Sequence, residues 1–399
     1  MRPVRLLVAT TARRVLGGAE RYLQALLPAL AARGHAVALL AEHDEPEPAA
    51  RLDGGAAGVT LLGAGLADAA AADAAAAWRP DLVFVQGLES PDLERRLVTE
   101  HPAALFTHSY YGTCVSGFKR HAFPFPEPCG RVMGPACLLL YVPRRCGGLD
   151  PRTTLRLYRL QEARRALLPR YRAVVTGSEH MRREFAAHGV TPERLFVTPM
   201  PPTGVAPDPA PPAPREIGDR LLYLGRLTAL KGVAQLLLEI PLAERRLGRP
   251  LGLDVAGEGP EEDRLRETAR RRGVAAVFHG WVDPARRLEL LRQADLLVVP
   301  SLWPEPFGLV GVEAACVGLP AAAYRMGAIP EWLESGVTGE LAAGDFPARG
   351  ALAEAIAAAL ATPEHHQRLR VGAWARARER TLERHCEALE RAFARAVAA

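Results

Sequence analysis

Short apolar runs alternate with amphipathic stretches along the first half of the chain. The runs that indicate strands cover residues 4–9, 35–40, 82–85, 104–107 and 174–176. They lack an exposed polar face, which is typical of parallel strands covered by helices on both sides. Helical stretches follow Gly17-Gly18-Ala19-Glu20 and Gly177-Ser178-Glu179. This alternation predicts an α/β domain with a parallel sheet over residues 1–198.

The second half repeats the same alternation. Predicted strands cover residues 221–224, 252–256, 277–280, 296–300 and 319–323. Between the halves, residues 199–215 are too rich in proline for a helix or a central strand, so they form an extended linker. A long helical pattern runs from about Trp374 to the end of the chain. The second predicted α/β domain therefore covers residues 216–373.

Composition supports two domains and excludes few functions. The chain has 399 residues, of which 49% are hydrophobic, enough for two buried sheets. Its 50 Lys and Arg residues slightly exceed its 45 Asp and Glu residues, a mild indication of an anionic ligand or surface. We find no nucleic-acid-binding motif, no apolar stretch of about 18–20 residues and no convincing signal peptide. We expect a cytoplasmic location, either free or in peripheral contact with the inner face of the membrane.

The strongest chemical signal lies at residues 304–313, directly after a predicted strand. A helix that opens at about Phe307 would point its free N–H groups at an anion, and Gly308 would let the backbone approach a pyrophosphate. Glu305 precedes this helix and Glu313 lies on it, so the two carboxylates could hold hydroxyls at the two ends of a sugar nucleotide. The alternative is a capped helix with solvated acids.

A second signal follows the first strand of the second domain. Arg226 and Lys231 lie in one loop, Gly225 to Gly232, and could face the same anion. Arginine offers a fork for two phosphate oxygens, and lysine offers a point charge. Two basic residues near a turn are often only solvated, but their pairing with residues 304–313 favours an anion site.

Together these motifs identify the chain as resembling glycosyltransferase family 4. The matching segments follow the family's order and cover residues 17–20, 225–232, 256–260, 279–282, 304–313 and 327–331. The resemblance implies the glycosyltransferase B fold, with two facing Rossmann-like domains. The first would bind the acceptor and be completed by a C-terminal helix, 374–399, that crosses back to it. The second would bind the nucleotide sugar.

The resemblance also implies a role for each matching residue. Arg226 and Lys231 would clamp the donor diphosphate, Glu305 would contact the transferred sugar and Glu313 the ribose. Further donor contacts would come from Gly17, Gly18, Trp281, Val282, Phe307, Gly308 and Leu309. His108 would approach the transferred sugar and the acceptor, although a lone histidine is more often structural. Transfer would retain the anomeric configuration and need no metal or other cofactor.

The expected function is transfer of a sugar from a nucleotide donor to a glycan, a lipid-linked or a small-molecule acceptor. The alternatives are a non-catalytic subunit of a glycan-assembly complex and a sugar-nucleotide epimerase on the same fold. The presence of Arg226, Lys231, Glu305 and Glu313 favours the transferase.

Four cysteines, Cys114, Cys129, Cys137 and Cys146, cluster in a segment without helix or strand periodicity. One interpretation is a structural zinc site, with sulfur atoms within about 4 Å of one another. An iron–sulfur cluster, disulfides and ordinary buried thiols are the alternatives. The region from Arg144 to Arg172 is rich in arginine. It forms either a face for anionic lipid or a solvated helix.

Overall fold

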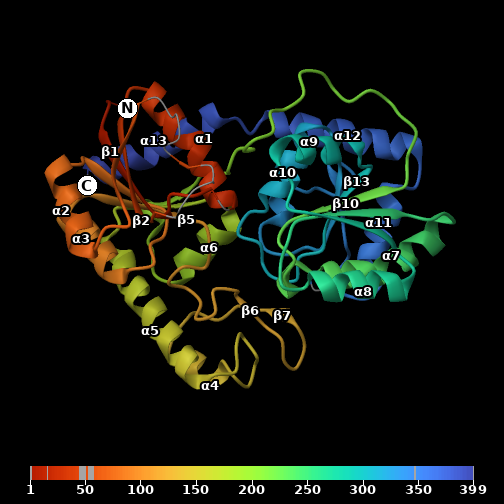
Figure 1. The fold of residues 1–399 in the computed structure, drawn as a ribbon, viewed down its shortest axis with the longest axis horizontal. Helices are drawn as coiled ribbons and strands as arrows, with labels where there is room; N and C mark the ends of the chain where they lie inside the picture. Colours follow the sequence, from red (N-terminus) through yellow and green to blue (C-terminus); the bar gives the residue numbers. More distant parts are fainter. Residues whose placement is uncertain (1, 16, 45–50, 53–57, 346, 399) are drawn as a thin grey trace. The chain divides into compact units, whose positions relative to one another are not determined.

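The structure is a computed structural model that describes residues 2–15, 17–44, 51–52, 58–345 and 347–398. The ends of the predicted domains, Met1 and Ala399, lie outside these residues. The chain forms two compact units (Figure 1). Unit 1 comprises Met1–Phe125, Cys129–Thr203 and Leu382–Ala399, and unit 2 comprises Pro126–Pro128 and Gly204–Thr381.

Unit 1 is built on a seven-stranded sheet in the order β3-β2-β1-β4-β5-β8-β9, and its neighbouring strands pair in parallel. Because β1 lies between β2 and β4, the winding of the chain reverses there, which makes a topological switch point at the carboxyl ends of these strands. The strands are β1 (Arg5–Ala12), β2 (Ala36–His43), β3 (Val59–Ala64), β4 (Leu82–Val85), β5 (Ala103–Thr107), β8 (Ala173–Thr176) and β9 (Leu195–Val197). The helices are α1 (Gly18–Ala32), α2 (Asp68–Trp78), α3 (Pro91–Glu100), α4 (Ala136–Leu140), α5 (Pro151–Leu167), α6 (Glu179–Ala187) and α13 (Leu382–Ala398).

Unit 2 repeats this topology in a six-stranded parallel sheet, β12-β11-β10-β13-β14-β15. Its switch point lies between β10 and β13. The strands are β10 (Arg220–Leu224), β11 (Gly252–Ala256), β12 (Ala275–Gly280), β13 (Leu296–Val299), β14 (Ala321–Ala323) and β15 (Gly339–Leu341). The helices are α7 (Val233–Leu247), α8 (Glu262–Arg272), α9 (Pro284–Gln293), α10 (Leu309–Cys316), α11 (Ala351–Ala359) and α12 (Pro363–Arg378). The predicted fold class, two Rossmann-like α/β domains, is confirmed.

The helical pattern that begins near Trp374 is two helices with different partners. Trp374 lies on α12 in unit 2, where its indole Nε1 donates to the carbonyl oxygen of Asp208 at 2.7 Å. Only α13 belongs to unit 1. The helix that returns to the first sheet therefore starts at Leu382, because the turn after Arg378 separates the two apolar stripes.

Polar contacts near the start and in the middle of α13 hold it against α1 and the residue that follows α1. The Tyr22 hydroxyl lies 2.8 Å from His385 Nε2, while His385 Nδ1 lies 3.0 Å from the carbonyl oxygen of Pro199. A carbonyl only accepts, so Nδ1 carries the proton and Tyr22 donates to Nε2. Nearer the C-terminus, the Arg33 guanidinium pairs with Glu390 at 2.6 Å and lowers the pKa of that carboxyl to about 2.

The cysteine-bearing segment after β5 has little regular structure beyond α4 and the two-residue strands β6 (Arg120–His121) and β7 (Glu127–Pro128). Figure 1 shows α4 and α5 extending away from the sheet of unit 1. Lys119 is 4% exposed and anchors the segment to α6 through Glu184 Oε1 at 2.5 Å. The Met133 amide donates at 2.9 Å to Nε2 of His188, the residue that caps the C-terminal end of α6. Lys119 and Met133 thus fix this segment, called the insert below, to unit 1, although Pro126–Pro128 within it are grouped with unit 2.

Candidate active site

The loops after β10 and β13 meet at the switch point of unit 2. Lys231 ends a single helical turn after β10, and Glu305 lies in the loop after β13. Lys231 Nζ lies 2.7 Å from Glu305 Oε1. The Leu302 amide donates to the carbonyl oxygen of Leu230 at 2.8 Å, which fixes the two loops to each other. Two residues 74 positions apart in the sequence are thereby joined at the edge where α/β sheets bind ligands.

Glu305 is held so that its two carboxylate oxygens have different hydrogen-bond partners. It is 5% exposed, and Oε1 accepts from Lys231, from the Ser301 hydroxyl and from Trp303 Nε1 at 2.9 Å. Within the described part of the chain, no protein donor contacts Oε2. A buried carboxylate needs further hydrogen-bond donors, so Oε2 is suited to a ligand hydroxyl. Sequence reasoning missed Ser301 and Trp303, although both lie within four residues of Glu305.

A close backbone approach fixes the position of Glu305. The Ala328 amide donates to the Glu305 carbonyl oxygen at 2.8 Å. Gly327 has φ of +62°, and a Cβ there would lie 2.4 Å from the Glu305 backbone nitrogen and oxygen. Only glycine fits at this contact. The matching segment 327–331 thus positions the loop that carries Glu305.

Arg226 lies in the same neighbourhood and its side chain is exposed. The Tyr223 hydroxyl donates to the Arg226 carbonyl oxygen at 2.8 Å and so holds the loop. Burial and the Glu305 carboxylate raise the pKa of Tyr223, while the Arg226 guanidinium opposes them. Glu305 and Arg226 therefore lie around one phenol, and the edge carries two cations, Arg226 and Lys231.

The helix after this loop, α10, begins at Leu309, two residues later than expected. Gly308 caps it with φ of +91°, a conformation that ends the preceding extended loop. The Gly311 amide donates to the Gly308 carbonyl oxygen at 3.1 Å, whereas the amides of Leu309 and Val310 precede the first hydrogen bond of the helix and are suited to an anion. Trp332 Nε1 donates to the Phe307 carbonyl oxygen at 2.8 Å and fixes this end of the helix.

Glu313 lies in the second turn of α10 and is 2% exposed. Its carboxylate is paired with Arg287 of α9, whose side chain is 13% exposed. This partner was not predicted, because nothing in the sequence joins two residues on different helices. The pair orients Glu313 and offsets the cost of burying its charge.

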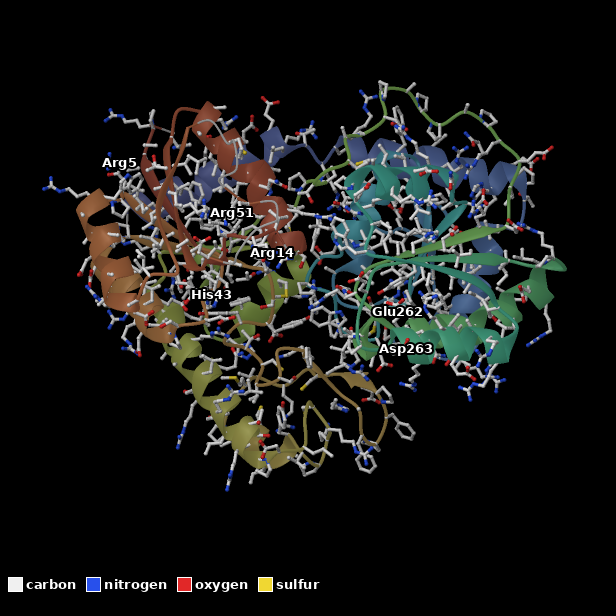
Figure 2. The ribbon with its side chains drawn as sticks, viewed as in Figure 1. Arg5, Arg14, His43, Arg51, Glu262 and Asp263 are labelled. Atoms are coloured by element: carbon white, nitrogen blue, oxygen red, sulfur yellow. The ribbon has the colours of Figure 1, made fainter. Side chains whose placement is uncertain are left out.

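Trp281 and Val282 follow β12. Trp281 is 64% exposed, and its amide donates to Glu258 Oε1 at 3.1 Å. Val282 is half-buried. The exposed indole offers a flat apolar surface at the same end of the sheet. Figure 2 labels Glu262 and Asp263, which lie in the first turn of α8 and complement its helix dipole.

In unit 1, His108 follows β5 directly. Its Nε2 lies 2.8 Å from Gln86 Oε1, an acceptor, so Nε2 carries the proton and Nδ1 is an acceptor. Burial, assisted by His385, lowers the pKa of His108 to about 4. The imidazole is therefore neutral at physiological pH.

Gly17 and Gly18 lie at the switch point of unit 1, where α1 begins. Gly17 is extended, with φ of −145°, and its amide donates to Glu20 Oε2 at 2.7 Å. Figure 2 labels three basic residues near this edge: His43 ends β2, Arg14 follows β1, and Arg51 forms an antiparallel bridge with Arg14. His108, Gly17 and the residues of unit 2 all lie at the carboxyl edges of their own sheets.

The predicted zinc site is not supported. All four cysteines of the insert are free thiols, which also removes the disulfide interpretation. In the described part of the chain, no three His, Cys, Asp or Glu side chains are placed to hold a metal ion. The thiols therefore do not converge on one point.

None of the helices among the described residues is both long and apolar enough to cross a bilayer. Of the nine arginines between residues 144 and 172, five show two different placements. Arg164 donates to the Leu88 carbonyl oxygen and Arg172 to that of Ala396, so both are structural. Three others, Arg152, Arg156 and Arg159, are exposed on α5.

Comparison with known families accounts for both halves of the chain. Residues 17–201 match the glycosyl transferase 4-like domain, and residues 209–375 match glycosyl transferases group 1. The chain belongs to the glycosyltransferases with the glycosyltransferase B fold. An Anabaena protein, HepE, solved in complex with UDP and glucose, has the same fold, with a TM-score of 0.68, 18% identity and coverage of 98% of this chain and 99% of that chain.

Curated relatives match over shorter stretches. Glycogen synthase of Mycobacterium tuberculosis is 41% identical over 128 residues, which are 32% of this chain and 30% of the relative. D-inositol 3-phosphate glycosyltransferase of Streptomyces griseus is 30% identical over 270 residues, or 63% of this chain and 53% of the relative. The chain thus spans between about a third and a half of the length of these relatives.

Proposed function

We propose that the protein transfers a sugar from a nucleoside diphosphate sugar to an acceptor, with retention of the anomeric configuration. The observation that carries the proposal is the Lys231–Glu305 pair at the switch point of unit 2, with Glu305 Oε2 left for a ligand. The complex of the Anabaena protein with UDP and glucose supports a nucleotide donor. Retention is what the resemblance to family 4 implies.

Each part of the site has a role in this reaction. Departure of the nucleoside diphosphate builds negative charge on its phosphates, and fixed cations stabilise that charge where it develops. Arg226 and Lys231 supply the cations, and the first-turn amides of α10 add oriented dipoles. Because these groups offset the charge, the proposal requires no metal for leaving-group departure.

The remaining residues bind and orient the donor. Glu305 Oε2 accepts a hydrogen bond from a hydroxyl of the transferred sugar, and Glu313, oriented by Arg287, accepts from the ribose. The base packs near Trp281 and Val282. For unit 1, the resemblance to family 4 implies donor contacts at Gly17 and Gly18 and a contact of neutral His108 with the transferred sugar and the acceptor.

A panel of nucleotide sugars distinguishes the transferase from its alternatives. We expect at least one donor to release nucleoside diphosphate and free sugar slowly when no acceptor is added. An epimerase would change the sugar without releasing nucleoside diphosphate. A non-catalytic subunit would bind a donor and leave it intact. Either result, in protein that binds the donor by calorimetry, would contradict the proposal.

We also propose that the insert of unit 1 contacts an anionic membrane and so brings the protein to a lipid-linked acceptor. Support comes from large apolar side chains exposed on the insert, Leu139 at 78%, Leu149 at 62% and Val132 at 52%. The exposed arginines of α5 lie on the same part of unit 1. Apolar side chains among basic ones suit the headgroup region of an anionic bilayer.

Arg156→Gln is expected to lower partitioning onto phosphatidylserine-containing vesicles about fivefold, because each basic residue near such a surface contributes about 1 kcal/mol. Flotation at low salt measures the partitioning. Arg271→Gln, which removes an exposed arginine of unit 2, is the matched control. Equal flotation of both variants and the parent would contradict the membrane contact.

A further inference from the structure

Gln86 is a buried polar residue at the carboxyl edge of the sheet of unit 1. It directly follows β4, which lies between β1 and β5, and it is 8% exposed. Its backbone amide donates to the Ala9 carbonyl oxygen of β1 at 2.9 Å. The Thr11 hydroxyl donates to the carbonyl oxygen of Gly87 at 2.9 Å, and φ of +91° at Gly87 turns the chain there. These contacts fix the backbone from which the Gln86 side chain projects.

The imidazole of His108, which follows β5, is fixed by aromatic neighbours. Its ring centroid lies 4.7 Å from that of Phe106 and 5.6 Å from that of Tyr22 on α1. The titratable side chains that act on it from the helices are Tyr22 and His385 of α13. This packing determines which ring nitrogen faces Gln86.

The hydrogen bond between the two side chains determines where the proton of His108 lies. Gln86 Oε1 accepts from His108 Nε2 at 2.8 Å, so Nε2 carries the proton. No donor among the described residues meets Nδ1, whose lone pair therefore remains available. In this tautomer Nδ1 can accept a hydrogen bond from a hydroxyl, the polar group in which sugars are richest.

The amide nitrogen of Gln86 has no hydrogen-bond partner in the described part of the chain, although it is buried. Leaving a buried donor unpaired costs free energy, and most buried polar side-chain atoms have a partner. The unpaired Nε2 lies on the same side chain that contacts His108. This combination is typical of a residue that completes its hydrogen bonds with a ligand.

We propose that Gln86 positions His108 for the transferase reaction and binds substrate beside it. Gln86 holds His108 in the Nε2–H tautomer, so that Nδ1 accepts a hydrogen bond from a substrate hydroxyl, and the Gln86 amide nitrogen donates to a substrate oxygen. The identity of the substrate rests on the proposed transferase function. The tautomer is a property of the protein alone and is measured without substrate.

A neutral amide is the suitable partner for this purpose. A carboxylate at position 86 would favour the imidazolium form of His108, in which both ring nitrogens donate. Nδ1 would then no longer accept a hydrogen bond. Glutamine accepts from Nε2 without adding charge, which agrees with the low pKa of about 4 that burial gives His108.

The first test is nuclear magnetic resonance of the full-length chain, labelled with ¹⁵N at histidine and free of substrate. Couplings between the ring nitrogens and the ring C–H protons distinguish the tautomers, and the spectrum of His108→Phe identifies the signals of His108. We expect Nε2–H at His108 and Nδ1–H at His385, which serves as the internal reference. An Nδ1–H tautomer at His108, which would place the amide nitrogen of Gln86 against the ring, would overturn the proposal.

Gln86→Glu then tests the contact directly. The added carboxylate is expected to raise the pKa of His108 from about 4 toward the ordinary histidine value of about 6.5. Gln24→Glu, which adds the same charge at an exposed residue of α1, is the matched control and should leave the pKa unchanged. An unchanged pKa of His108 in Gln86→Glu would show that the two side chains do not pair.

Turnover of a nucleotide-sugar donor tests the role in the reaction. A raised pKa keeps His108 protonated over more of the acidic range, so the acidic limb of kcat/KM for Gln86→Glu should move about one to two pH units upward. Gln86→Ala should lower kcat about 10- to 100-fold and change KM less, because the ring loses its orientation. An unmoved limb in Gln86→Glu, or turnover of Gln86→Ala within twofold of the parent, would overturn the proposed role.

The two sets of measurements separate this proposal from the proposed function. A parent chain that turns over no donor would contradict the transferase, and the tautomer and pKa of His108 would still decide whether Gln86 sets its protonation. If Gln86→Ala fails to fold, Gln86→Glu, which keeps the size of the side chain and its acceptor oxygen, decides.

Discussion

Lys231→Ala is expected to lower the turnover number about 100- to 1000-fold, the usual cost of removing one group that stabilises charge in a transition state. The amine lies 2.7 Å from Glu305 at the edge where the diphosphate would leave. Its loss should leave the fold intact, because the side chain is 26% exposed. Glu305 also keeps Ser301 and Trp303 as donors.

The measurement is steady-state release of nucleoside diphosphate from whichever donor the parent turns over. Lys231→Arg should also be impaired, because a planar fork does not replace a compact ammonium between Glu305 and a phosphate. Arg264→Ala, at an exposed residue of α8, is the control and should match the parent. Turnover of Lys231→Ala within twofold of the parent would remove Lys231 from the donor site.

Lysine is rare in this chain, and position 231 is one of the two places where it occurs. Of the 50 basic residues, only Lys119 and Lys231 are lysines. Both form close ion pairs with glutamates, Lys119 with Glu184 and Lys231 with Glu305. Arginine can also pair with a shielded carboxylate, as Arg287 does with Glu313, so what distinguishes Lys231 is its compact ammonium at the proposed diphosphate site.

The sheets could be predicted because their central strands are buried on both faces. Such strands leave continuous apolar runs, and all ten expected strands are present within a few residues. The sequence did not indicate β3, β9 and β15. β9 and β15 have three residues each, and β3 exposes Thr60 and Leu61 at the sheet edge. Short or half-exposed strands leave no distinctive apolar run.

The pairing of the loops after β10 and β13 could also be anticipated, since both follow parallel strands that become neighbours. The partner of Glu313 could not, because Arg287 lies on another helix, 26 residues earlier. The cysteines show a similar limit. Their clustering is visible in the sequence, but whether they meet at a point or surround a cavity depends on how the irregular segment folds.

Phe393→Ala is expected to destabilise unit 1 by about 3–5 kcal/mol, the usual cost of removing a buried phenylalanine. Phe393 lies on α13, is fully buried and packs edge-on against Phe84 of β4, with ring centroids 4.9 Å apart. The loss is large beside the 5–15 kcal/mol that stabilises a typical domain.

Because Phe393 packs in the core of unit 1, we expect its loss to act on that unit. Calorimetry should show one unfolding transition moved to lower temperature. The fluorescence of the indoles in unit 2 should change with temperature as it does in the parent; these indoles are Trp281, Trp303, Trp332 and Trp374. Val397→Ala, at a half-exposed residue of the same helix, should change the free energy of unfolding by less than about 1 kcal/mol. An unchanged calorimetric trace for Phe393→Ala would mean that α13 contributes little to the first sheet. The C-terminal segment would then be an appendage, rather than the element that completes the core of unit 1.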